Sequence, residues 1–199
     1  NMKFTCRSLI TLLSVALVAS CSNSSNNAPR PDAATPTYSA TVTRTEFGIP
    51  HIKAEDWGSL GYGYGYAYAQ DNFCVTMREI VIAGGRSAEL MGETDGNADR
   101  DLFFRFLNGS EEEFRRKYVD VLPLKVRELV TGFADGMNRY LRETGVENLP
   151  EGDAGCRNAN WVYEINDFDL WQHLRRIALG GSSDQGLIRE GLIAVDGPD

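Results

Sequence analysis

The residues of this 199-residue chain that could do hydrolytic or metal chemistry are few and scattered. The two histidines, His51 and His173, lie far apart, and neither has a second His or a Cys at the spacing of a metal site. We interpret His51 as a hydrogen-bonding structural residue. The Ser182-Ser183 pair has no base close to it in sequence, and there is no Gly-x-Ser-x-Gly motif. The sequence therefore contains neither a convincing nucleophile nor a metal site.

An acidic cluster is the remaining source of acid–base chemistry. Hydrolysis by paired carboxyl groups needs one of them buried, so that its pKa rises, and nothing in the sequence marks such a residue. We therefore interpret the cluster as a solvated surface. Its members are Glu89, Glu93, Asp95, Asp99 and Asp101.

The alternating glycines Gly61, Gly63 and Gly65 superficially suggest a dinucleotide-binding loop. No apolar strand precedes them, however, and Tyr66 stands where the motif needs its third glycine. We reject that interpretation and expect no cofactor. The formal net charge of −8 and the lack of a basic stripe also argue against a nucleic-acid partner, because phosphate binding needs clustered Lys and Arg.

Residues 1–21 have the composition of a probable lipoprotein export signal. Lys3 and Arg7 precede an apolar run that is too short to span a bilayer, which needs about 20 residues. The run ends at Cys21 in a sequence that resembles the lipobox of bacterial lipoproteins, so we expect Cys21 to be lipidated. Ordinary cleavage, which would leave a soluble periplasmic protein, is the alternative. Either route predicts the periplasm or outer membrane of a Gram-negative bacterium, with membrane contact only through the lipid.

Residues 22–37 are rich in Ser, Asn, Pro and Ala and are expected to form a flexible tether. Residues 38–199 are expected to form one domain. With Cys6 removed and Cys21 lipidated, Cys74 and Cys156 form an even pair in an oxidising compartment, and we predict a disulfide between them. Closing that loop of about 82 residues would stabilise the fold by about 4 kcal/mol. Two unrelated buried thiols are the alternative.

The elements that must position these residues are mostly helices. Strands are expected over 41–45 and 51–54, joined through a turn at Gly48-Ile49-Pro50. Helices are expected over 57–82 with an Asp56 cap, from a Ser110-to-Glu113 capping box to Pro123, and over 124–143, 168–179 and 184–195. Asp167 would cap the helix over 168–179, and Gly180-Gly181 would end it.

The glycines at 58, 61, 63 and 65 each cost up to about 1 kcal/mol inside a helix. We therefore expect another backbone to pass close to them. The helix over 124–143 carries an apolar face at steps of three and four residues, which predicts that it packs on a core. The fold class is thus α+β, mostly helical with short N-terminal strands.

Residues 43–52, TRTEFGIPHI, resemble the opening signature of the penicillin-acylase family, and residues 61–74, GYGYGYAYAQDNFC, resemble its next block. The likeness continues through 85–92 and 99–105 and extends over 41–195. Around Cys74 and in 155–161 the chain is most similar to acyl-homoserine-lactone acylases and aculeacin-type lipopeptide acylases.

That resemblance implies an α subunit, cut with its β chain from one precursor and forming with it the αββα sandwich of the N-terminal-nucleophile hydrolases. The chain would end where such an α subunit ends. The nucleophile would be the first serine of the β chain, so no catalytic residue is expected here. Some relatives hold a structural calcium through an acid; this sequence offers only Asp184 there, so calcium stays open.

In relatives, the segment corresponding to 170–182 lines part of the acyl pocket. The substrate-binding residues that this implies are Leu174, Ile177, Ala178, Gly181 and Ser182. The alternative for the apolar ones is an ordinary core contact between subunits.

The function implied is hydrolysis of the amide bond of N-acyl-homoserine lactones to a fatty acid and homoserine lactone, which is quorum quenching. Penicillin or cephalosporin β-lactams and lipopeptides are alternative acylated substrates. An alternative of another class is a non-catalytic envelope lipoprotein that serves as a binding module.

Overall fold

The structure, a computed structural model, describes residues 37–94, 96–151 and 155–182. The predicted leader with Cys21, the tether up to residue 36 and the helix over 184–195 lie outside these residues. Within them, no helix combines the length and the apolar character needed to cross a membrane.

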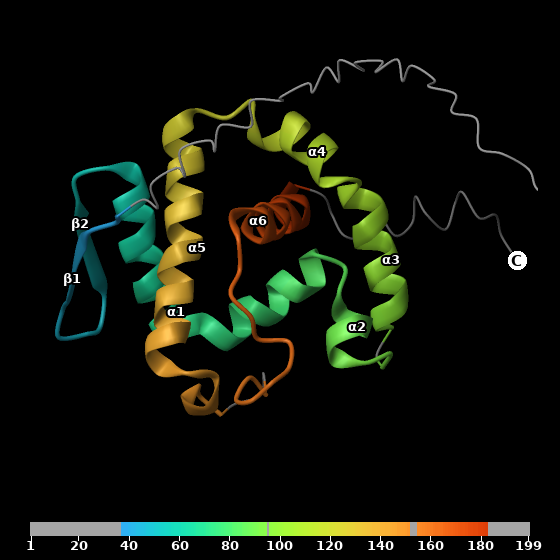
Figure 1. Cartoon of the computed structure of the whole chain (residues 1–199), viewed down its shortest axis with the longest axis horizontal. Helices are drawn as coiled ribbons and strands as arrows, with labels where there is room; N and C mark the ends of the chain where they lie inside the picture. Colours follow the sequence, from blue (N-terminus) through green and yellow to red (C-terminus); the bar gives the residue numbers. More distant parts are fainter. Residues whose placement is uncertain (1–36, 95, 152–154, 183–199) are drawn as a thin grey trace, which may run out of the picture. The chain divides into compact units, whose positions relative to one another are not determined.

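Figure 1 shows a mostly helical fold with one two-stranded sheet, as the sequence predicts. The elements are β1 (Ala40–Arg44), β2 (Pro50–Ala54), α1 (Trp57–Ala83), α2 (Ser87–Met91), α3 (Asn97–Asn108), α4 (Glu111–Phe114), the π-helical turn η1 (Arg115–Val119), α5 (Leu124–Thr144), the 3-10 turn η2 (Val146–Asn148) and α6 (Asp167–Ser182). The predicted strands and longest helices are confirmed to within one residue at their ends. The short helices α2 and α3 were not predicted.

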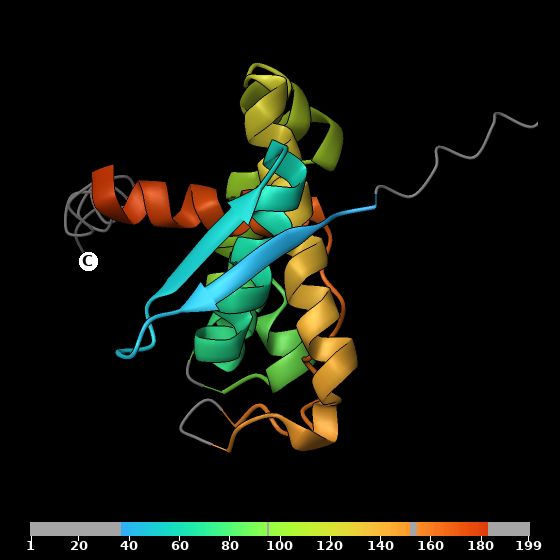
Figure 2. The same ribbon diagram turned by 90° about the vertical axis from the view of Figure 1, so that its left-hand side faces the viewer.

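The two strands form an antiparallel hairpin that lies over α1 (Figure 2). Val42 is paired with Ile52, and alternate side chains of each strand turn toward the helix. The hairpin can lie this close to α1 because residue 63 is glycine: a Cβ there would lie 2.6 Å from the Cβ of Ala40. The α1 cap at Asp56 is confirmed, since its Oδ1 accepts a hydrogen bond of 2.7 Å from the amide of Ser59.

Helices α1 and α5 touch backbone to backbone, which confirms the close approach expected at Gly61 and Gly65, whereas Gly58 and Gly63 face side chains. A Cβ at Gly61 would lie 2.8 Å from the carbonyl carbon of Leu129. A Cβ at Gly132 of α5 would lie 2.8 Å from the carbonyl carbon of Gly58. The same relation recurs one turn further along both helices, at Gly65 and Gly136. These four glycines let the two longest helices pack closer than any side chain would allow.

The core lies where α1, α5 and α6 meet, and α6 is surrounded by the other helices in Figure 1. Met77, Val81 and Met137 are completely buried there. The capping box of α4 is confirmed: the Oγ of Ser110 accepts a 3.3 Å bond from the amide of Glu113.

The predicted ends of α6 were wrong. Its first turn is capped by Asn166, whose Oδ1 accepts from the amide of Asp169, while Asp169 accepts from the amide of Asn166. Asp167 instead accepts two hydrogen bonds of 2.9 Å from Arg115, which holds the pKa of its carboxyl below the usual value. At the other end the helix continues through Gly180 and Gly181 to Ser182, because glycine weakens a helix without necessarily ending it.

The acidic cluster is not wholly a solvated surface. Asp101 is 5% exposed, and its two carboxylate oxygens accept bonds of 2.8 and 2.7 Å from the amides of Ser87 and Ala88. Its negative charge therefore compensates the partial positive charge of the free amides in the first turn of α2. The sequence did not predict that helix. Glu89, Glu93 and Asp99 are exposed, and Asp95 lies outside the described residues.

His51 is exposed on β2, opposite Thr43. Its side chain makes no hydrogen bond within the part of the chain that the structure describes, so the predicted structural role is not met there. Side chains of β1 and β2 alternate between α1 and solvent, and His51 falls on the solvent side.

Candidate functional site

An apolar hollow of about 240 Å³ opens between α1, α5 and α6. Among the residues that the structure describes, its wall contains no Asp, Glu, Lys, Ser or Cys. The lining residues are Tyr64, Tyr68, Thr76, Leu129, Val130, Phe133, Leu170, His173, Leu174 and Ile177. Such a wall suits a hydrocarbon group, and its polar groups are the hydroxyls of Tyr64, Tyr68 and Thr76 and the imidazole of His173.

Helical spacing and the glycine contact together build this wall. Leu170, His173, Leu174 and Ile177 follow one another at three- and four-residue steps, so they share one face of α6. On the opposite side, the close approach of α1 and α5 brings their aromatic rings together. The ring of Phe133 lies 5.2 Å from that of Tyr64 and 5.6 Å from that of Tyr68.

The structure separates the five residues predicted to bind substrate. Leu174 and Ile177 line the hollow and are 42% and 54% exposed. Ala178 lines a second hollow, beside Phe114 and Tyr118, and Leu174 lines that hollow as well. Gly181 faces open space, and the side chain of Ser182 lies outside what the structure describes.

The aromatic half of the wall was missed from the sequence. Tyr64 and Tyr68 are four residues apart on one helix, and Phe133 is on another. The four-residue spacing was an available signal for a shared face of α1, but nothing local to it indicated that α5 would complete the wall.

His173 is the one titratable imidazole in the hollow. It is partly buried, and its Nδ1 has no hydrogen-bond partner among the described residues. Burial lowers the pKa of His173, and the nearby Arg176 guanidinium lowers it further, whereas Glu79 acts in the opposite direction. Arg176 and Glu79 form an ion pair with each other. The imidazole is thus held neutral, in keeping with the apolar wall.

We expect the free energy of unfolding to decrease as the pH falls below about 6.5, the ordinary value for His. The pKa of His173 is lowered in the folded chain, so the unfolded chain binds the proton first and is favoured by acid. Urea titrations between about pH 5 and 8 measure this slope, and His173→Gln should reduce it. His51→Gln is the matched control, because His51 is exposed. An unchanged slope in His173→Gln would contradict the assignment.

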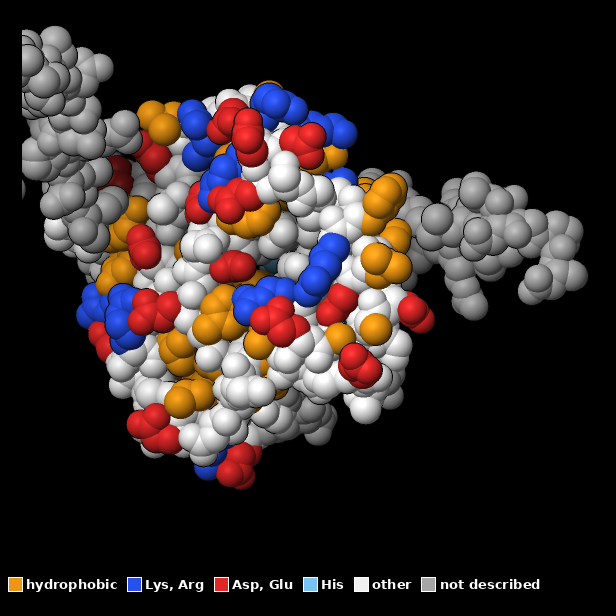
Figure 3. All heavy atoms as spheres, turned by 45° about the vertical axis from the view of Figure 1, so that its right-hand side comes forward, with side chains coloured by type: hydrophobic (Ala, Val, Ile, Leu, Met, Phe, Trp, Pro, Cys, Tyr) orange, Lys and Arg blue, Asp and Glu red, His pale blue; other side chains and the backbone are white. Residues whose placement is uncertain are grey.

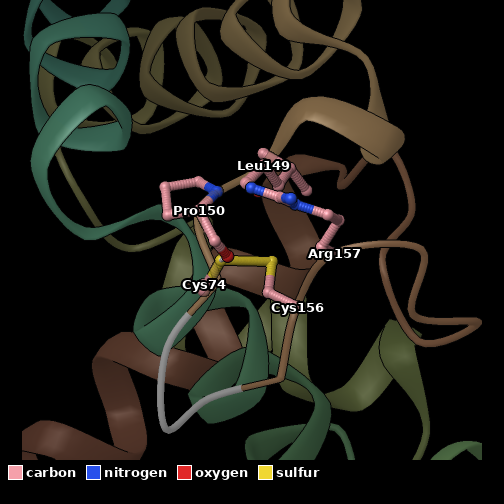
Figure 4. Close-up of a disulfide and its surroundings, with 5 residues drawn as sticks. All are labelled: Cys74, Leu149, Pro150, Cys156 and Arg157. Atoms are coloured by element: carbon pink, nitrogen blue, oxygen red, sulfur yellow. Dashed lines mark hydrogen bonds between the residues drawn. A yellow bond between two sulfur atoms is a disulfide. The ribbon is translucent and has the colours of Figure 1, made fainter.

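A disulfide joins the middle of α1 to the loop before α6 (Figure 4). The Sγ atoms of Cys74 and Cys156 are bonded, and their Cα atoms are 5.3 Å apart. Arg157 fixes the loop beside the bridge, since its Nε donates a 2.8 Å hydrogen bond to the carbonyl of Leu149. The bridge follows a break in α1 at Asn72 (φ −136°) and lies two residues before a lining residue of the hollow.

The described residues hold no cluster of three His, Cys, Asp or Glu side chains that could bind a metal. Asp184, the acid considered for calcium, lies outside them. On the face drawn in Figure 3, basic and acidic side chains are interspersed with hydrophobic ones.

The fold and the hollow define a mostly helical chain with a largely apolar binding wall. Residues 39–192 match the penicillin amidase family, and the chain belongs to that family. The sequence-based recognition of the family is thereby confirmed.

Two curated relatives indicate the range of this likeness. The chain is 34% identical to aculeacin-A acylase of Actinoplanes utahensis over 81% of its length and 21% of that protein. It is 39% identical to acyl-homoserine lactone acylase PvdQ of Pseudomonas fluorescens over 73% of its length and 19% of that protein. The chain thus spans about a fifth of these curated relatives.

Among solved structures, it is similar to the thermostable penicillin G acylase from Alcaligenes faecalis. The TM-score is 0.62 at 26% identity, over 77% of this chain and 80% of the other.

Proposed function

We propose that this chain is the α portion of an acylase that hydrolyses N-acyl-homoserine lactones to a fatty acid and homoserine lactone. The observation that carries the proposal is the apolar hollow, whose wall includes Leu174 and Ile177, in a chain that is 39% identical to an acyl-homoserine lactone acylase. The hollow would receive the hydrocarbon tail. Each buried methylene would contribute about 0.8 kcal/mol to binding.

The chemistry in this proposal belongs to a β chain made from the same precursor, and the two chains together would form the αββα sandwich. The hydroxyl of the β chain's first serine attacks the amide carbonyl, and its own α-amine takes the proton. Backbone or side-chain donors of the β chain stabilise the resulting oxyanion. The amine of homoserine lactone leaves with a proton, and water then releases the fatty acid. This chain contributes binding and orientation of the tail.

The within-family alternatives are lipopeptides and β-lactams. Similarity to aculeacin-A acylase over 81% of the chain favours the lipopeptide alternative. A lipopeptide also carries a hydrocarbon tail for which the same wall is suited, so the hollow alone does not separate the two. Export to the periplasm, with lipidation at Cys21, remains part of the proposal.

The test is to express the complete precursor and incubate the processed enzyme separately with a long-chain acyl-homoserine lactone, a lipopeptide and benzylpenicillin. We expect homoserine lactone to appear, detected by mass spectrometry. Failure to release it, together with cleavage of the lipopeptide or of benzylpenicillin, would overturn the substrate assignment. Failure on all three would overturn the acylase proposal.

Filling the hollow should change the preference for tail length. We expect Ile177→Trp to lower kcat/KM for long-chain acyl-homoserine lactones by roughly ten- to a hundredfold and to affect short-chain ones far less. Leu102→Trp is the matched control, because Leu102 is 71% exposed on α3, away from the hollow. Equal losses for long and short tails would show that the hollow does not hold the acyl chain.

A further inference from the structure

The tip of the β1–β2 hairpin carries two large apolar side chains that the described structure leaves mostly exposed. Phe47 is 83% exposed and Ile49 is 58% exposed, on either side of Gly48. Such a pair on a protruding turn is unfavourable in water, so it indicates a contact surface. The tip plays no part in the hollow.

The backbone of the tip is rigidly held. The amide of Gly48 donates to the carbonyl of Thr45 (2.9 Å), and the amide of Thr45 donates to the carbonyl of Ile49 (3.1 Å). The hydroxyl of Thr45 accepts a further bond of 3.2 Å from the amide of Ile49. Gly48 has a φ of +79°, which a residue with a side chain rarely adopts. The two apolar side chains are therefore presented on an ordered turn.

Arg44 ties this turn to α1. Its Nη1 donates to the carbonyl of Gly48 (2.7 Å) and to Asp71 (3.0 Å). Its Nη2 donates to the carbonyl of Ala67 and to Gln70, both at 3.0 Å. One guanidinium thus fixes the tip against the helix just before the break at position 72. Only the planar fork of Arg reaches all four acceptors at once.

We propose that Phe47 and Ile49 are an anchor that inserts into an apolar pocket of the β chain, and that Arg44 is the positioning residue that holds the anchor in its docking geometry. We assign the pocket to the β chain because about four fifths of the length of the curated relatives lies outside the segment that this chain matches. A preordered apolar anchor loses little conformational freedom on association, as an interface residue of large effect should. This proposal rests on the αβ arrangement in the proposed function.

The test uses the processed αβ enzyme made from the complete precursor, without substrate. Dilution series in a fixed, sub-denaturing urea concentration, followed by size-exclusion chromatography, give the concentration at which half of the α chain has dissociated. We expect Phe47→Ala to raise that concentration about tenfold or more, with Ile49→Ala acting in the same direction. Phe47→Leu keeps the apolar bulk and should give a smaller change.

The comparison is Phe106→Ala, which removes an equally large side chain outside the hairpin, 87% exposed on α3, and tests whether exposure alone produces the effect. Equal dissociation of the Phe47 and Phe106 variants would overturn the tip as the anchor, and so would an unchanged Phe47 variant. Far-ultraviolet circular dichroism of each purified complex establishes that the variant is folded. If Phe47→Ala gives no soluble complex, the comparison of Ile49→Ala with Phe106→Ala decides in the same way.

The role of Arg44 is tested by combination. Arg44→Lys keeps the positive charge but loses the planar guanidinium. We expect Arg44→Lys alone to promote dissociation of the complex. In a protein that already carries Phe47→Ala, we expect Arg44→Lys to add little further dissociation. Fully additive effects would show that Arg44 acts independently of the anchor. Because dissociation is measured without substrate, a stable complex that releases no homoserine lactone would refute the proposed function and leave this inference intact.

Discussion

Removing the disulfide with Cys74→Ser and Cys156→Ser is expected to lower the free energy of unfolding by about 4 kcal/mol. The bridge closes a loop across a sequence separation of 82 residues, and a bond across a loop of that size restricts the unfolded chain strongly. In the folded state it also holds the loop before α6 against α1, next to the Arg157 contact with Leu149.

Urea unfolding of the processed enzyme, with and without a reductant, measures this effect. The two single variants and the double variant should be equally destabilised, because each removes the same bond. Reductant should lower the stability of the original protein to that level and leave the variants unchanged. Additive losses in the double variant would show that the cysteines act as separate buried thiols.

Replacing Gly61 with alanine is expected to destabilise the fold by about 3 kcal/mol, the upper part of the range for overpacking. The new Cβ would lie 2.8 Å from the carbonyl carbon of Leu129, and backbone cannot turn aside as the end of a side chain can. Helices α1 and α5 would have to separate. The contact between Phe133 and the two tyrosines of the hollow would then loosen, so long-chain substrate binding should weaken as well.

Gly181→Ala is the matched control for this change. Gly181 also lies in a helix, but no atom of the described residues stands within 4 Å of a Cβ placed there. We expect that variant to be unchanged or more stable by up to about 1 kcal/mol, because alanine favours the helix. Thermal unfolding of both complexes provides the comparison. Similar melting temperatures for Gly61→Ala and the original protein would contradict backbone contact at this crossing.

The elements whose signals are local were predictable. Periodicity and breakers located α1 and α5, and the Asp56 and Ser110 caps followed from residues within one turn. The glycines of α1 even indicated a close backbone, because their intrinsic cost in a helix needs a compensating contact.

The amino-acid sequence by itself thus determined the family, the main helices and the pairing of two cysteines. Only the tertiary structure decided which side chains meet across long separations. Asp167 accepts hydrogen bonds from Arg115, 52 residues earlier in the chain, so Asn166 and not Asp167 caps α6. Asp101 is buried because α2 places its amides over it. The hollow is likewise completed by Phe133 from another helix, since a cavity depends on how elements pack and not on the residues of any one of them.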